Sequence, residues 1–273
     1  MCVPGCQETV HRALSRRGFF RTATAAGFAV TAVSASGELA QAAPRSRNVV
    51  DLTHTMSPEF PTFFGTPGIE FERKFELKKD GFNMFLWKLI EHAGTHLDAP
   101  IHFSENGATA EKISAETLVV PLAVINVVSR AEENPDYLLS REDLRDWERR
   151  FGKIPVNACV AMHSGWARHV GNAAKYTGKD AGGMFHFPGI SPLAAEWLIK
   201  ERKVAGIAVD TLSLDNGPSK DFRTHTLWLS SGRWGLENVA NLDKVREAGA
   251  TLVVGLAKVK DATGGPARLI ALM

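Results

Sequence analysis

The chain has 273 residues, of which 44% are hydrophobic and 23% are charged, and its formal net charge is +2 at pH 7. This length and apolar share suffice for a domain that buries its core without disulfides. The near balance of charge, with no clustered basic surface, argues against a nucleic-acid partner.

The N-terminal segment is typical of an export signal. Residues 15–21 read Ser-Arg-Arg-Gly-Phe-Phe-Arg, a twin-arginine pattern, and a weakly apolar stretch over 23–33 follows. Residues 40–42, Ala-Gln-Ala, offer a small-residue cleavage site. The apolar stretch is shorter than the ~20 residues that a membrane span needs. We therefore expect a signal peptide over 1–42 and a periplasmic domain over 43–273 without membrane contact; the alternative is a solvated basic N-terminus.

Strand-like and helical segments alternate loosely along the remaining chain. Short apolar runs rich in branched residues predict strands over 119–128, 158–163, 204–210 and 251–259. The sequence therefore predicts an α/β fold, in which a mixed β-sheet core is flanked by helices.

Three helices are expected between these strands. Ser140 is typical of an N-cap because acidic residues follow it in the first turn. Ser191 followed by Pro192 predicts a second helix start, with an apolar stripe that extends to Lys203. A third helix is expected over 238–248.

One cysteine remains after signal cleavage. Cys2 and Cys6 would leave with the signal peptide, so Cys159 has no partner for an internal disulfide. Because it lies in the apolar run 158–162, we expect a buried and unreactive thiol.

A dense cluster of metal-ligand types occupies residues 91–103. In an extended chain His92, His96 and Asp98 project to one side, and two imidazoles with a carboxylate form a compact site for a divalent cation. Gly94 leaves room on that side, and Pro100 would bend the chain so that His102 returns over the metal. The alternative is a set of unrelated polar residues on a solvated strand.

The run from His92 to His102 resembles the signature of the cyclase family, which includes bacterial kynurenine formamidases and isatin hydrolases. Supporting similarity extends over nearly all of the chain after the signal, in the blocks 51–54, 163–166, 187–191, 206–215 and 264–268. The resemblance implies a swivelling β/β/α-like fold, a divalent Zn or Mn ion, and assembly as a homodimer or homotetramer.

The resemblance also implies roles that spacing alone does not give. Residues His92, His96 and Asp98 would bind one ion, and Asp98 would bridge to a second ion held by His225 and Glu237. Judged by the residues alone, His225 would be a core or surface histidine. Some relatives use a single metal, so the number of ions stays open. The match of His102 implies a catalytic proton shuttle.

The expected activity is metal-dependent hydrolysis of an amide bond by activated water. The resemblance places Phe63, Phe64 and Trp166 near the substrate. An aromatic wall of this kind would suit a flat substrate, such as an N-formyl aryl amine, an isatin-like lactam or a cyclic imide. Three alternatives remain, and the first is a serine hydrolase using Ser164, although no Gly-x-Ser-x-Gly motif occurs. The second is an exported metal-binding or ligand-binding protein without activity. The third is another reaction at the same site, such as ring closure.

Overall fold

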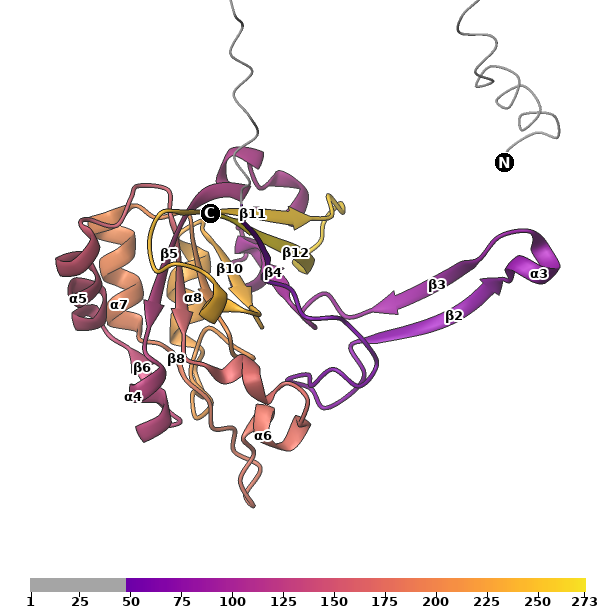
Figure 1. Cartoon of the computed structure of the whole chain (residues 1–273), viewed down its shortest axis with the longest axis horizontal. Helices are drawn as coiled ribbons and strands as arrows, with labels where there is room; N and C mark the ends of the chain where they lie inside the picture. Colours follow the sequence, from indigo (N-terminus) through magenta and orange to yellow (C-terminus); the bar gives the residue numbers. More distant parts are fainter. Residues whose placement is uncertain (1–47) are drawn as a thin grey trace, which may run out of the picture. The chain divides into compact units, whose positions relative to one another are not determined.

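A computed structural model describes residues 48–273, which belong to one compact unit (Figure 1). The expected signal peptide over 1–42, with Cys2 and Cys6, lies outside the described residues. Among the described residues, no helix is long and apolar enough to cross a membrane. The strands are β1 (Val49–Asp51), β2 (Ile69–Phe75), β3 (Met84–Leu89), β4 (His96–Asp98), β5 (Val119–Asn126), β6 (Leu138–Leu139), β7 (Cys159–His163), β8 (Gly189–Ile190), β9 (Gly206–Val209), β10 (Trp234–Glu237), β11 (Ala250–Leu256) and β12 (Gly264–Leu272).

Eight of these strands form one mixed sheet in the order β1-β12-β11-β5-β7-β9-β10-β4. Strands β5, β7, β9 and β10 are parallel to one another, whereas the pairs that involve β1, β4, β11 and β12 are antiparallel. Strand β12 also pairs with β4, so the sheet closes on itself like a barrel. The prediction of a mixed sheet with flanking helices is confirmed.

Alternating side chains of the central strands supply two separate hydrophobic cores. In β7, Cys159 and Ala161 enter the core inside the closed sheet, whereas Val160 and Met162 enter the core under the helices. A strand buried on both faces reads as a continuous apolar run, which is why 158–163 was recognisable in the sequence. Cys159 is fully buried, and burial raises the pKa of its thiol, as expected for an unreactive cysteine.

The helices that cover the sheet are anchored by local capping. Ser140 and Asp143 form a reciprocal capping box at the start of α5, and the Ser191 hydroxyl accepts a hydrogen bond from the Ala194 amide of α7. Helices α5, α7 and α8 lie together on one side of the sheet (Figure 1). The helices are α3 (Leu77–Asp80), α4 (Val128–Glu133), α5 (Arg141–Phe151), α6 (Ala173–Thr177), α7 (Pro192–Trp197), which continues as a π-helical turn over Leu198–Arg202, and α8 (Arg223–Ser230).

The predicted strands correspond to β5, β7, β9 and β11, and the helices expected after Ser140 and Ser191 are α5 and α7. The prediction of a third helix over 238–248 is wrong. Asn238 and Asn241 both have positive φ angles of 54°, and only a 3-10 turn over Leu242–Lys244 forms there. The amides at the start of this segment bond to residues far away in the chain; Val239, for example, donates to the carbonyl of Val209 in β9.

Strand β9 passes directly beneath an aromatic ring of β10. A Cβ atom at Gly206 would lie 2.1 Å from the Trp234 ring, and Trp234 is itself buried. We expect Gly206→Ala to lower the free energy of unfolding by about 1–3 kcal/mol through overpacking. Gly171→Ala is the matched control, because nothing lies within 4 Å of a Cβ there. Urea denaturation of both variants measures the difference, and equal stability would contradict this packing.

Candidate metal centre

The first half of the histidine cluster lies in a turn rather than in a strand. Residues 91–95 form turns and bends, Gly94 has a φ of 66°, and the extended β4 begins only at His96. The expectation that His92, His96 and Asp98 share one face of an extended chain is therefore wrong, because a left-handed glycine bends the chain between them. The turn nevertheless brings His92 back beside Asp98, with 2.6 Å between Nδ1 and Oδ1.

Strand β4 presents His96 and Asp98 on one side and packs Leu97 into the inner core on the other. Its neighbour β10 runs antiparallel, in a register that pairs His96 with Glu237. Helix α8 supplies His225, whose Nε2 lies 3.0 Å from Glu237 Oε1 and 3.6 Å from Asp98 Oδ2. Segments more than a hundred residues apart thus meet at one cluster.

Two overlapping groups of ligand atoms result. One contains His92, His96 and Asp98, and the other contains Asp98, His225 and Glu237, with all ligand atoms of each group within 4.8 Å of one another. Asp98 belongs to both groups. The structure therefore brings together the five residues that the sequence and the family resemblance suggested as ligands.

Hydrogen bonds outside the cluster fix which imidazole nitrogen points inward. His96 Nδ1 donates to the Gly94 carbonyl, and His225 Nδ1 donates to Asp215, so both Nε2 atoms face the carboxylates. The Thr263 hydroxyl donates its single proton to Glu91 and therefore accepts from His92 Nε2. That arrangement directs Nδ1 of His92 at Asp98.

The cluster is electrostatically incomplete without a cation. His96 Nε2 and Asp98 Oδ2 are buried and have no hydrogen-bond partner. In neutral His92, Nδ1 is an acceptor facing the acceptor Oδ1 of Asp98, so a proton or a metal ion must supply positive charge there. Three imidazoles and two carboxylates fit a divalent transition metal.

The pKa values describe how the cluster obtains positive charge from protons instead. Burial opposes protonation of His96, but the carboxylates of Asp98 and Glu237, each 3.3 Å from its Nε2, outweigh it and raise its pKa to about 10. Burial likewise disfavours the charged forms of His225 and Asp98. The carboxylates of Asp215, Asp98 and Glu237 nevertheless raise the pKa of His225, and the neighbouring imidazoles lower the pKa of Asp98. A metal ion would displace these protons, so metal binding should strengthen as pH rises.

His102 lies beside the cluster without belonging to either ligand group. It follows Pro100 in a 3-10 turn over Pro100–Phe103, and its ring stacks on His92 with 3.7 Å between centroids. Burial lowers the pKa of His102 to about 4, so its ring is neutral at physiological pH. A neutral imidazole next to the metal position can accept a proton and return it.

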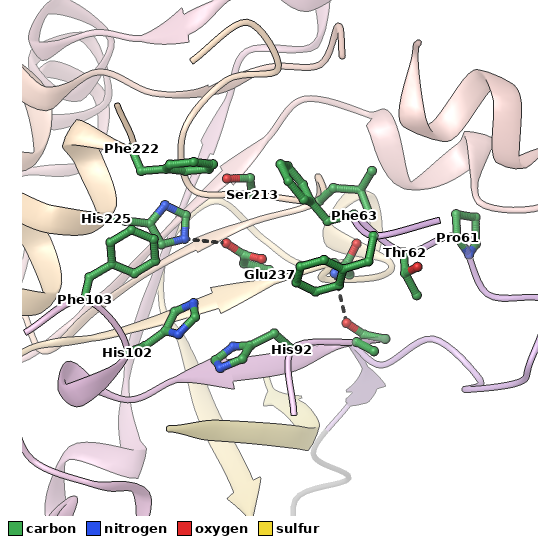
Figure 2. A pocket seen from close by; sticks show the side chains of 15 residues that line it. Pro61, Thr62, Phe63, His92, His102, Phe103, Ser213, Phe222, His225 and Glu237 are labelled. Atoms are coloured by element: carbon green, nitrogen blue, oxygen red, sulfur yellow. Dashed lines mark hydrogen bonds and ion pairs between the residues drawn. The ribbon is translucent and has the colours of Figure 1, made fainter. Parts of the chain in front are cut away.

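A pocket of about 260 Å³ opens onto the cluster. Figure 2 shows the rings of His92, His102 and His225 near Glu237, with aromatic rings gathered around them. Phe63, Phe103 and Phe222 supply these rings, and Phe64 also lines the pocket. Phe63 is backed by Phe185, stacked at 4.6 Å between centroids. The pocket therefore joins a polar floor to apolar walls suited to a flat ligand.

Two residues singled out in the sequence lie elsewhere. Trp166 does not line the pocket; it packs in the same apolar cluster as Phe63, and its indole N–H donates to the Tyr176 carbonyl. The structure thus does not bring Trp166 to the pocket, and its contact with substrate stays a prediction. The Ser164 hydroxyl donates to Asp210, and no histidine within residues 48–273 hydrogen-bonds it, so the geometry of a serine nucleophile is missing there.

Three residues that support the site were not predicted from the sequence: Asp215, Thr263 and Glu91. Asp215 accepts from the amides of Thr224 and His225 as well as from the His225 ring, at 2.7 Å from Nδ1. It therefore fixes both the first turn of α8 and the ring orientation. An acidic residue ten positions before a histidine carries no recognisable pattern, so only the tertiary structure could reveal this pair.

We expect Asp215→Asn to weaken metal binding by about 10–100-fold, because the uncharged amide no longer holds the His225 imidazole in its ligating orientation. Competition with a chelating dye measures the affinity of the purified protein. Asp221→Asn, an exposed neighbour before the same helix, is the control. Equal affinity of the two variants would contradict the orienting role.

Comparison with known proteins agrees with this geometry. Residues 50–216 match the family model described as Cyclase, putative cyclase. The isatin hydrolase of Roseibium aggregatum is 30% identical over 242 residues, covering 82% of this chain and 91% of that protein. The kynurenine formamidase of Bacillus thuringiensis subsp. konkukian is 25% identical, covering 81% and 95%.

Solved structures show the same fold. The isatin hydrolase A of Ralstonia solanacearum superimposes with a TM-score of 0.78 at 31% identity, covering 100% of this chain and 99% of that one. An isatin hydrolase bound to the product analogue thioisatinate gives a TM-score of 0.78 at 29% identity, covering 83% and 92%. The chain belongs to the cyclase family, and with its ligand groups it is a metal-dependent hydrolase.

Proposed function

We propose that this protein hydrolyses an amide bond in a small aromatic substrate, with an isatin-like lactam as the first candidate and an N-formyl aryl amine as the second. The observation that carries the proposal is the opening of a five-residue ligand cluster into a pocket with aromatic walls. The similarity to isatin hydrolases over most of both chains supports the order of the candidates.

The proposed ligands are His92, His96 and Asp98 for one ion, with His225 and Glu237 completing a second position that shares Asp98. The bound ion, Zn or Mn, would bring the pKa of a water towards ~7 and polarise the substrate carbonyl. Around it, Asp215, Thr263 and the Gly94 carbonyl hold the three imidazoles in their ligating orientation.

His102 is proposed to move the proton. Its neutral ring accepts a proton from the attacking water and delivers it to the leaving nitrogen, which otherwise departs as a poorly stabilised amide anion. Stacking against His92 keeps the ring beside the cluster. Phe63, Phe103 and Phe222 exclude water from an aromatic substrate and orient its plane.

The test is an assay of the purified protein against isatin and N-formylkynurenine, together with elemental analysis, before and after chelation. We expect turnover that the chelator abolishes and that Zn or Mn restores, with isatin the better substrate. Bound metal without turnover of either compound would reject the proposed substrates. A protein that neither contains nor takes up metal would reject the assignment of the ligands.

Export and assembly are further parts of the proposal. The twin-arginine pattern at Arg16 and Arg17 supports delivery to the periplasm of a folded, metal-loaded domain over 43–273. A homodimer or homotetramer is proposed from the family resemblance. Cell fractionation of the wild-type chain and of the Arg16→Lys/Arg17→Lys variant tests export, and retention of both in the cytoplasm would reject it.

A further inference from the structure

One hydroxyl in the wall of the pocket takes no part in the metal centre. Ser213 lines the pocket and is only 4% exposed, and Figure 2 shows it among the labelled aromatic rings on the side of Glu237. Of the residues that line this pocket, Ser213 alone has a buried side-chain polar atom without a hydrogen-bond partner within residues 48–273. Burying such a group is unfavourable unless a hydrogen bond compensates, so the hydroxyl indicates a contact with a ligand.

The other polar side chains of the pocket are already engaged. The Thr62 hydroxyl donates to the Thr66 carbonyl at 2.6 Å. The side-chain amide of Asn238 donates to the Gly94 carbonyl and accepts from the Tyr176 hydroxyl. The three histidines and the glutamate of the lining belong to the metal centre or to the proposed proton transfer. The serine hydroxyl is therefore the uncommitted polar group of the wall.

The backbone that follows Ser213 is fixed by contacts with the metal centre. The amide of Leu214 donates to Glu237 Oε1 at 2.9 Å. The next residue, Asp215, holds the His225 ring at 2.7 Å from Nδ1. The hydroxyl thus has a fixed position relative to the ligand atoms, as a group that recognises a substrate requires.

We propose that Ser213 is a specificity residue, which donates a hydrogen bond to a second carbonyl oxygen of the substrate, near the amide that is cleaved. The inference rests on the proposed function, because it defines the substrate class of the same site as aryl amides with a neighbouring ketone. Isatin and N-formylkynurenine share this feature. In both, a ketone is attached to the ring carbon ortho to the amide nitrogen.

The amide that is cleaved does not itself need this hydroxyl. In the proposed function the ion polarises its carbonyl, and His102 delivers a proton to its nitrogen. A further oxygen would lie in a wall where the ring centroids of Phe63 and Phe222 are 6.1 Å apart, and it would lose its water there. A buried carbonyl without a donor is unfavourable, and a buried donor without an acceptor is unfavourable too. The hydroxyl therefore favours substrates that carry the second oxygen over those that lack it.

Equilibrium titration of the metal-loaded protein with two acids tests the proposal. The first acid, 2-aminophenylglyoxylate, forms when water cleaves the C–N bond of isatin and keeps the ketone; the second, 2-aminophenylacetate, has a methylene group in its place. We expect Ser213→Ala to weaken binding of the keto acid by about 10–100-fold and to change binding of the other acid by less than about twofold. Ser129→Ala, the same substitution at an exposed serine, is the control and should change neither.

Turnover separates failure of this proposal from failure of the proposed function. In the Ser213 variant, kcat/KM for isatin should fall by a similar factor while metal content stays that of the wild type. Hydrolysis of isatin together with unchanged binding of the keto acid, or with equal losses for both acids, would overturn the role of Ser213 and leave the hydrolase standing. A fall in kcat alone would make the hydroxyl a proton relay and would also overturn it.

The opposite result is equally distinct. A wild type that prefers the keto acid, and loses that preference in the Ser213 variant, but hydrolyses neither isatin nor N-formylkynurenine would support the recognition and reject the hydrolase activity. A metal-loaded wild type that binds both acids equally, or binds neither, would reject a neighbouring ketone as the feature that this pocket selects.

Discussion

Replacing Asp98 with Ala is expected to abolish metal binding and to lower turnover by about a thousandfold or more. Asp98 is common to both ligand groups, and its carboxylate is buried with one oxygen free of hydrogen bonds. Its removal leaves four ligand residues, with one carboxylate fewer to balance a divalent charge. Without the ion, water at neutral pH is a far weaker nucleophile.

Glu237→Gln separates the one-ion and two-ion forms of this centre. It leaves the group of His92, His96 and Asp98 intact, so the variant should retain an ion that the Asp98 variant loses. Elemental analysis gives the stoichiometry, and Asp243→Ala is an exposed control. Full metal content in the Asp98 variant would place the centre elsewhere.

Replacing His102 with Ala should lower kcat by about 10²–10⁴ and leave metal content unchanged. His102 lies outside both ligand groups but stacks on His92, so it can act on protons without holding the ion. Because its pKa of about 4 lies well below neutrality, the loss should be similar from pH 6 to pH 8, where the ring is neutral throughout.

His169→Ala is the control for this substitution, since His169 lies against Trp166 outside the pocket. Steady-state kinetics with the metal-loaded proteins separate kcat from KM. Near-normal kcat in the His102 variant would remove the proton shuttle from the mechanism. Loss of metal together with activity would instead make His102 a ligand.

The sequence by itself determined the local structure and the chemical character of the centre. Strands such as β7 were recognisable because burial on both faces requires a continuous apolar run. The helix α5 was recognisable because Ser140 and the acidic residues after it satisfy its free amides. The motif from His92 to His102 predicted a metal site, because its ligand types are unusual at such density.

The tertiary structure alone decided how distant segments meet. The position of Glu237 opposite His96 depends on the register of β10 against β4, and the support of His225 by Asp215 depends on where α8 docks. Gly94 forms a left-handed turn where the pattern favoured an extended chain. Asn238 and Asn241 have positive φ angles, so turns form where a third helix was expected. Local preferences act over a few residues, whereas these outcomes depend on the packing and hydrogen bonding of segments far apart in the chain.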